Sequence, residues 1–247
     1  MTLRPISRSG WVLVTAVLGL SGCGHDGGPS AVDLAASRGI APPFDPAAFV
    51  RDVDNPYFPL TRGTVYSYVA QTAEGVETSE VTVTRDTKVI LGVTATVVHD
   101  RVLLNGSLSE DTFDWYAQDK SGNVWYLGED TKQYENGVQV GTVGSWEAGK
   151  DGAAAGIIML AHPRIGDTYQ QENSPGVVAD RARVLSLSET VSVPYGSFTD
   201  CLQTLDWTPL EPGVREFKYY ATGVGVVLEV TPRGGRERVE LTALSRP

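Results

Sequence analysis

The acidic residues in the middle of the chain could support hydrolytic chemistry or bind calcium. They are Glu110, Asp111, Asp114, Asp119, Glu129 and Asp130. Glycoside hydrolysis needs two carboxyl groups a few ångströms apart, and the sequence does not reveal that separation. A hydrolase that uses Glu110, Asp114 or Glu129 is therefore one open hypothesis. Calcium also prefers oxygen ligands, but acids at strand ends are usually solvated and Asp119 lies in an ordinary turn sequence, so we expect no calcium site.

Other catalytic and metal-binding patterns are missing from the sequence. His25, His99 and His162 are far apart and form no ligand spacing typical of zinc. No Gly-x-Ser-x-Gly motif is present, and no histidine lies next to Cys201. We therefore expect no metal or cofactor, and we favour a protein that is not an enzyme.

The aromatic residues are better candidates for a binding site. Trp146 is flanked by Gly144 and Gly149, where nothing local requires a core tryptophan. We expect its ring to face a ligand. The candidate ligand-binding residues are Trp146, Trp115, Trp125, Ile157 and Met159. Such a set could line an apolar groove for an acyl chain, a sugar or a peptide, although aromatic pairs also simply stabilise sheets.

The first 22 residues have the pattern of an export signal. Arg4 and Arg8 precede an apolar run that is too short to span a membrane. The sequence Leu20-Ser21-Gly22-Cys23 then resembles the lipobox of bacterial lipoproteins. This resemblance implies cleavage before Cys23 and lipid on its sulfur, which would anchor the protein stably. Residues 23–46 are interpreted as a flexible tether that ends in one short helical turn capped by Asp45.

Charge restricts the partners of the chain. Without residues 1–22, 18 basic and 30 acidic side chains leave a net charge of −12. Nucleic-acid binding needs a basic face, so we exclude it. Anionic headgroups would repel this domain, so we expect it to contact the membrane only through the lipid anchor. The expected location is therefore extracytoplasmic, on the periplasmic or surface face of a bacterial membrane.

Residues 47–247 are predicted to form an all-β domain. Apolar residues alternate with polar ones in short segments that are separated by turn residues. The segments 114–117 and 124–127 predict a hairpin, and 133–140 predicts a single strand. We expect an antiparallel meander that forms a curved half-barrel or a sandwich, with one long loop over residues 148–165 crossing between its halves. Cys201 begins a strand, and we interpret it as a buried structural residue.

Three motifs make the chain resemble a family of uncharacterised secreted bacterial proteins. They are Asn55-Pro56-Tyr57-Phe58-Pro59-Leu60, Asp114-Trp115-Tyr116-Ala117 and Tyr219-Tyr220-Ala221-Thr222-Gly223-Val224-Gly225. The last motif is also similar to a hairpin of periplasmic β-proteins related to lipoprotein-carrier half-barrels. The resemblance implies a curved sheet around an apolar groove, and it implies no catalytic residues.

The sequence therefore predicts a lipid-anchored β-domain that binds an apolar or envelope-derived ligand, such as a glycan, without catalysis. Two alternatives stay open. One is the carboxylate-dependent hydrolase acting on envelope glycans or esters, and the other is an envelope scaffold that presents a sheet edge.

Overall fold

The structure is a computed structural model that describes residues 43–232 and 237–247. The predicted signal peptide 1–22, the lipidated Cys23 and nearly all of the tether lie outside these residues. Within them, no helix has the length and apolar character needed to cross a membrane. The one short helix, η1 (Pro46–Ala48), is the turn expected at this position, and the Asp45 side chain accepts a hydrogen bond from the Ala47 amide.

The described chain is almost entirely antiparallel β-sheet, which confirms the all-β prediction. The strands are β1 (Val65–Thr72), β2 (Gly75–Ile90), β3 (Val93–Leu104), β4 (Ser107–Gln118), β5 (Val124–Glu135), β6 (Val138–Gly141), β7 (Trp146–Glu147), β8 (Gly156–Met159), β9 (Thr168–Gln170), β10 (Arg181–Val193), β11 (Gly196–Trp207), β12 (Glu216–Ala221), β13 (Gly225–Val230) and β14 (Arg238–Ser245). Burial alternates along β1 and the first half of β2, as expected for strands with one face inside.

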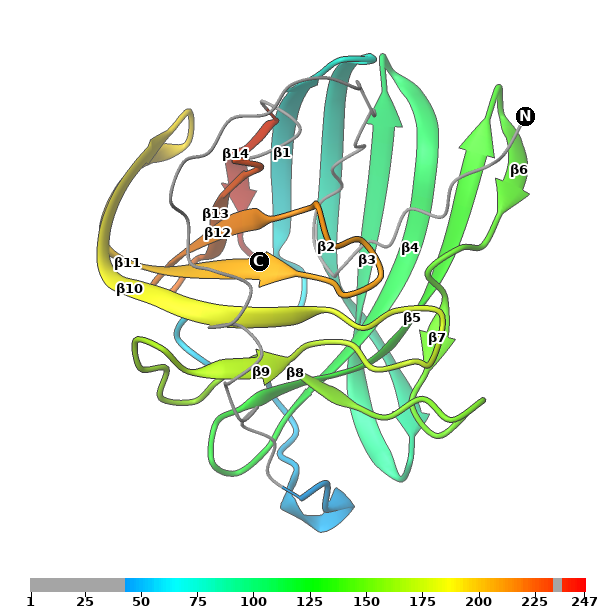
Figure 1. The fold of residues 1–247 in the computed structure, drawn as a ribbon, viewed down its shortest axis with the longest axis vertical. Helices are drawn as coiled ribbons and strands as arrows, with labels where there is room; N and C mark the ends of the chain where they lie inside the picture. Colours follow the sequence, from blue (N-terminus) through cyan, green and yellow to red (C-terminus); the bar gives the residue numbers. More distant parts are fainter. Residues whose placement is uncertain (1–42, 233–236) are drawn as a thin grey trace.

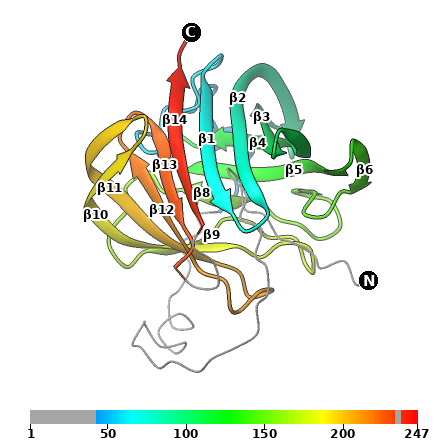
Figure 2. The same ribbon diagram turned by 90° about the horizontal axis from the view of Figure 1, so that it is seen from above.

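The strands form one continuous sheet with the order β6-β5-β4-β3-β2-β1-β14-β13-β12-β11-β10-β9. The strand β14 returns to pair with β1, so the first and last strands lie side by side in its middle (Figure 2). The sheet curls strongly: β1 to β4 run from top to bottom in Figure 1, whereas β10 and β11 cross the view. It does not close into a barrel, and the expected curved half-barrel is confirmed.

The segment 148–165 crosses between the two ends of the sheet, as predicted, but it is not wholly a loop. Its residues Gly156–Met159 form β8, which pairs with the outer edge of β5 beside β7. The prediction of one strand over 133–140 is also wrong. The chain turns at Asn136 and Gly137, both with positive φ, and returns as β6. A local apolar pattern does not reveal either the free edge that β8 joins or a two-residue turn inside a strand.

The space inside the curl is filled mainly by apolar side chains. Cys201 is buried, as expected. The inner face also carries an unusual number of charged residues, including Asp114, Glu129, Lys218 and Glu229. Buried charges are costly without partners, so this polar part of the interior is the feature that most needs an explanation.

Candidate functional site

The hydroxyl of Tyr126 connects two buried carboxyl groups on neighbouring strands. Asp114 on β4 and Glu129 on β5 are register partners. The Tyr126 oxygen lies 2.5 Å from Asp114 Oδ1 and 2.8 Å from Glu129 Oε2. A tyrosine hydroxyl carries one proton, so it donates to one carboxylate and must accept from the other. At least one of the two carboxyl groups is therefore protonated in this arrangement.

The pKa of Asp114 agrees with this proton count. The pKa of Asp114 is raised from 3.8 to about 7, mainly by burial; the hydrogen bond from Tyr126 opposes this rise, and the negative charge of Asp100 adds to it. A carboxyl group that changes protonation near neutral pH can exchange a proton with a ligand.

Two aromatic rings enclose this group. Tyr116, two residues after Asp114 on the same face of β4, stacks on Tyr126 with 4.6 Å between ring centroids. Trp146 on β7 approaches Tyr126 edge-on at 5.4 Å, because β7 pairs with β5 at Glu129. The indole Nε1 of Trp146 is buried and has no hydrogen-bond partner among the described residues. Trp146 therefore adds a spare donor beside the two carboxyl groups.

Lys218 holds a second group of acids on the other half of the sheet. Its Nζ lies 3.5 Å from Glu216 Oε2, 3.8 Å from Glu229 Oε1 and 4.0 Å from Asp206 Oδ2. Burial alone lowers the pKa of Lys218, but the three carboxylates outweigh it and raise the pKa above its ordinary value. Lys218 is therefore a buried cation that three acids already surround.

Glu172 interacts electrostatically with members of both groups. It is completely buried, and neither of its carboxyl oxygens has a hydrogen-bond partner in the described structure. Burial raises its pKa well above the ordinary value, and Asp180, Glu129 and Asp114 raise it further. Lys218 acts in the opposite direction. Glu172 is therefore electrostatically coupled both to Asp114 and Glu129 and to Lys218.

Two residues close to Glu172 in the sequence, Gln171 and Tyr169, also keep unused hydrogen-bonding capacity. Gln171 donates its amide to Asp206 at 3.2 Å, while its Oε1 is buried without a partner. The Tyr169 hydroxyl is buried and likewise unpartnered within the described residues. We call the set Asp114, Tyr126, Glu129, Trp146, Tyr169, Gln171 and Glu172 the interior polar site.

The interior polar site does not have the composition of a metal centre. No group of three or more His, Cys, Asp or Glu residues in the described parts of the chain is arranged to hold a metal ion. The site has both donors and acceptors, namely an indole N–H, a phenol, an amide oxygen and carboxyl groups. Such a mixture can bind an organic ligand that has hydroxyl or amino groups.

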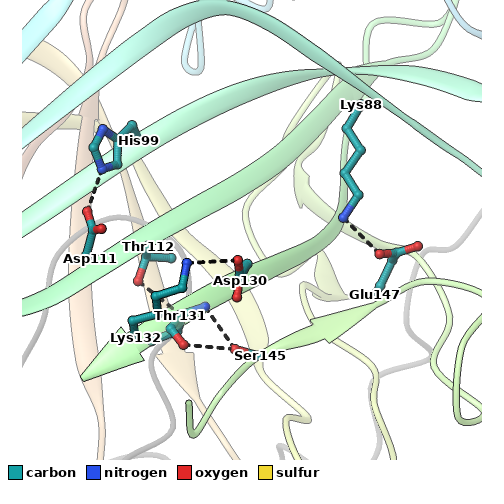
Figure 3. A network of polar contacts seen from close by, with 9 residues as sticks. All are labelled: Lys88, His99, Asp111, Thr112, Asp130, Thr131, Lys132, Ser145 and Glu147. Carbon is teal, nitrogen blue, oxygen red and sulfur yellow. Dashed lines mark hydrogen bonds and ion pairs between the residues drawn. The ribbon is translucent and has the colours of Figure 1, made fainter. Parts of the chain in front are cut away.

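Figure 3 shows a second set of polar contacts from β2 to β5 and β7, in which His99, Asp111, Asp130 and Lys132 lie on the opposite face of the sheet. His99 Nε2 lies 2.5 Å from Asp111 Oδ1, and the His99 ring stacks on Phe113 at 4.2 Å. Lys132 pairs with Asp130 at 3.1 Å. His99 thus has a carboxylate partner that its sequence neighbourhood did not reveal. These side chains are partly exposed and each makes a direct contact, which is typical of a solvated sheet face.

The predicted ligand-binding residues are all buried, and they are divided between the two faces of the sheet. Only Trp146 adjoins the interior polar site. Trp115 lies on the opposite face, beneath Lys88, whose Nζ is 3.1 Å from the ring centroid. Trp125 is also on that face and donates its Nε1 to Asp119 at 2.9 Å. Ile157 and Met159 are core residues of β8. The five residues are therefore not one continuous lining.

The structure also separates the acidic residues that could have bound calcium. Asp114 and Glu129 belong to the interior polar site, whereas Asp111 and Asp130 lie on the opposite face. Asp119 accepts hydrogen bonds from Ser121, Asn123 and Trp125, so the turn itself occupies its oxygens. Glu110 accepts from Thr112 at 3.2 Å. These acids form no common site in the described residues.

Sequence reasoning identified Asp114 and Glu129 but missed Tyr126, Glu172 and Lys218. One signal was available. Asp114 and Lys218 each stand two residues before a core tyrosine, Tyr116 or Tyr220, and so share its face of the strand. A charged residue on the inner face is a reason to look for a buried polar site.

Comparison with known proteins adds little about chemistry. No family model and no curated protein matches the chain. Among solved structures, it is similar to an exported protein with a YmcC-like fold from Bacteroides fragilis, with 14% identity and a TM-score of 0.41 over 77% of this chain and 99% of that one. It is also similar to a lipoprotein from Parabacteroides distasonis, with 12% identity and a TM-score of 0.41 over 76% and 98%. Likeness at this level does not show a shared activity.

Proposed function

We propose that this chain is a lipid-anchored, extracytoplasmic binding protein that takes an envelope-derived ligand into the interior polar site without catalysis. The observation that carries the proposal is the unused hydrogen-bonding capacity of Trp146, Tyr169, Gln171 and Glu172. The sequence favoured an apolar ligand, and we now favour a polar one, because the residues predicted to line an apolar groove are divided between two faces of the sheet. Attachment through Cys23 rests on the lipobox resemblance alone.

The energetic argument is simple. A buried donor or acceptor without a partner costs about 1–3 kcal/mol, and native proteins keep few of them. Four such side chains occur on β7, on β9 and in the residues after β9; Trp146 packs against Tyr126, and Glu172 is electrostatically coupled to Asp114 and Glu129. A ligand with hydroxyl or amino groups would form hydrogen bonds with these side chains. Those bonds would remove the cost of the unpaired groups and so favour binding.

Native mass spectrometry of the full-length protein, extracted from membranes in mild detergent, tests the proposal. We expect a non-covalent adduct that is retained under gentle conditions and lost on denaturation. Trp146→Phe, which keeps a ring and removes the spare N–H, should reduce the occupied fraction. Trp115→Phe is the matched control on the opposite face and should not. Consistently empty protein, or equal occupancy in both variants, would contradict the proposal.

The anchor has its own test. Radiolabelled palmitate should enter the wild-type protein, and Cys23→Ala should move the protein from the membrane fraction to the soluble fraction. A Cys23→Ala protein that still fractionates with membranes would show that something other than lipid holds it there.

One observation favours a carboxylate-dependent hydrolase as the second candidate. The two distances to Tyr126 sum to 5.3 Å, so Asp114 Oδ1 and Glu129 Oε2 are no farther apart than that. Retaining glycosidases place their two carboxyl groups about 5–5.5 Å apart. Both side chains are buried, at 2% and 3% exposed, so a substrate would have to open the sheet to reach them. Release of sugars or alcohols from envelope glycans or esters by wild type, abolished in Asp114→Asn, would establish this candidate instead.

A further inference from the structure

We propose that the ligand of the interior polar site carries a protonated amino group as well as hydroxyl groups, and that the ammonium pairs with Glu172. This inference rests on the proposed function and specifies the chemical class of its ligand. A hydroxylated primary amine is the simplest molecule that meets both requirements.

The distribution of charge around Glu172 is the first argument for an amine. The groups that face it are Asp180, Glu129 on β5, Asp114 on β4 and Lys218 on β12. Three are acids, and the one cation is already surrounded by Asp206, Glu216 and Glu229. The site therefore has a surplus of acidic groups, which an added positive charge would complement.

The hydrogen-bonding geometry is the second argument. Both oxygens of Glu172 are buried and accept no hydrogen bond, so the residue offers two acceptor positions. Gln171 Oε1, on the adjacent residue, is a third unused acceptor. An ammonium group has three N–H donors and no acceptor, which matches this set. A metal ion is a poorer match, because no suitable group of three ligands exists in the described residues.

The unpaired donors of the interior polar site require a ligand that carries hydroxyl groups as acceptors. Trp146 Nε1 and the Tyr169 hydroxyl are buried without partners. Neither can be satisfied by an ammonium, which has no acceptor, so the ligand needs oxygen atoms as well. An alkylamine without hydroxyl groups would leave these donors unmet.

Binding of such an amine must release a proton. Burial, Asp180, Glu129 and Asp114 raise the pKa of Glu172 well above its ordinary value, which favours the neutral carboxyl group in the free protein. When the ammonium arrives, the O–H bond of Glu172 breaks, its proton passes to the buffer, and the carboxylate pairs with the ammonium. A neutral polyol can bind without ionisation of Glu172, so proton release on binding distinguishes an amine from an uncharged sugar.

Isothermal titration calorimetry with two matched probes tests this inference. The probes are glucamine, an open-chain polyol with one primary amine, and sorbitol, in which a hydroxyl replaces that amine. Titrations of the full-length protein in detergent at pH 7 are run in phosphate and in MOPS, neither of which is a primary amine. These buffers have different ionisation enthalpies, so the difference in measured heat gives the number of protons released.

We expect glucamine to bind at least about tenfold more tightly than sorbitol and to release close to one proton per molecule bound. Glu172→Gln should reduce glucamine affinity by about tenfold or more and abolish proton release, while sorbitol binding should change little. Glu80→Gln makes the same substitution at an exposed acid on β2, and it should behave like wild type.

Three results would overturn the inference: absence of glucamine binding, equal affinity for the two probes, or glucamine binding without proton release. If Glu172→Gln does not fold, the number of protons that the wild-type protein releases on binding glucamine still tests the inference. Failure of the inference is distinguishable from failure of the proposed function. A co-purified neutral ligand seen by mass spectrometry would preserve the function and refute only the amine.

Discussion

Replacing Asp114 by asparagine should change how the stability of the protein depends on pH. The pKa of Asp114 is about 7 in the folded protein, against 3.8 for an ordinary aspartate. Because the folded pKa is raised, the folded state holds a proton between pH 4 and 7 that the unfolded state has already lost. The contribution of Asp114 to stability is therefore complete below pH 4 and is lost as the pH rises to 7.

The magnitude follows from the size of the shift. About three pKa units at 1.36 kcal/mol each correspond to a loss of about 4 kcal/mol of unfolding free energy between pH 4 and pH 7. The group is only 2% exposed, so solvent screening does not reduce this figure greatly. Asparagine is nearly the same size and cannot ionise. Relative to wild type, Asp114→Asn should therefore become more stable by about 4 kcal/mol as the pH rises over this range.

Urea denaturation at pH 4, 5, 6, 7 and 8, with linear extrapolation to zero urea, measures this difference. Other buried acids also titrate, but they are present in both proteins, so the comparison between variants isolates Asp114 and its hydrogen-bonded partner. Asp86→Asn, at an exposed position on β2, is the control and should run parallel to wild type. If Asp114→Asn also runs parallel to wild type, Asp114 does not hold its proton in the folded protein between pH 4 and 7, and the reasoning from its raised pKa is refuted.

Three further predictions concern packing, charge and thiols. Gly128→Ala should destabilise by about 3 kcal/mol in urea, because a Cβ at φ +129° would lie 2.3 Å from a backbone oxygen of β7; Gly137→Ala, at φ +75° with nothing within 4 Å, should cost only about 1 kcal/mol. Lys218→Met should destabilise by about 3–5 kcal/mol at pH 7, because three acids lose their buried cation, and by less at pH 4, where those acids take up protons; an equal loss at both values would contradict the pairing. Ellman's reagent should detect no thiol in the native protein and one after unfolding, because Cys201 is buried and Cys23 is expected to carry lipid on its sulfur; a second thiol would argue against the anchor.

Local patterns in the sequence were sufficient to predict the class of fold. Alternating polar and apolar residues indicated antiparallel strands, and the turn held by Asp119 and the cap at Asp45 were visible as turn and cap sequences. The errors occurred where pairing partners are distant. Whether Gly156–Met159 forms a strand depends on a free edge of β5, which lies more than twenty residues earlier in the chain.

The candidate site was less predictable than the fold. The sequence singled out Asp114, Glu129 and Trp146 for separate reasons, as acids or as a tryptophan without a local role. It did not indicate that one tyrosine hydroxyl contacts both acids or that Trp146 packs against the same ring. Cross-strand register brings these residues together, and register depends on turns and bulges that a propensity pattern does not resolve.

Composition and alternation by themselves determined that this is an acidic chain of antiparallel strands, because each strand shows its two faces through a period of two residues. Only the tertiary structure decided that Glu172 interacts electrostatically with Asp114, Glu129 and Lys218. The alternation says which face a side chain occupies, but the curvature of the sheet decides which distant strands those faces oppose. The chemistry of the interior polar site arises from that curvature.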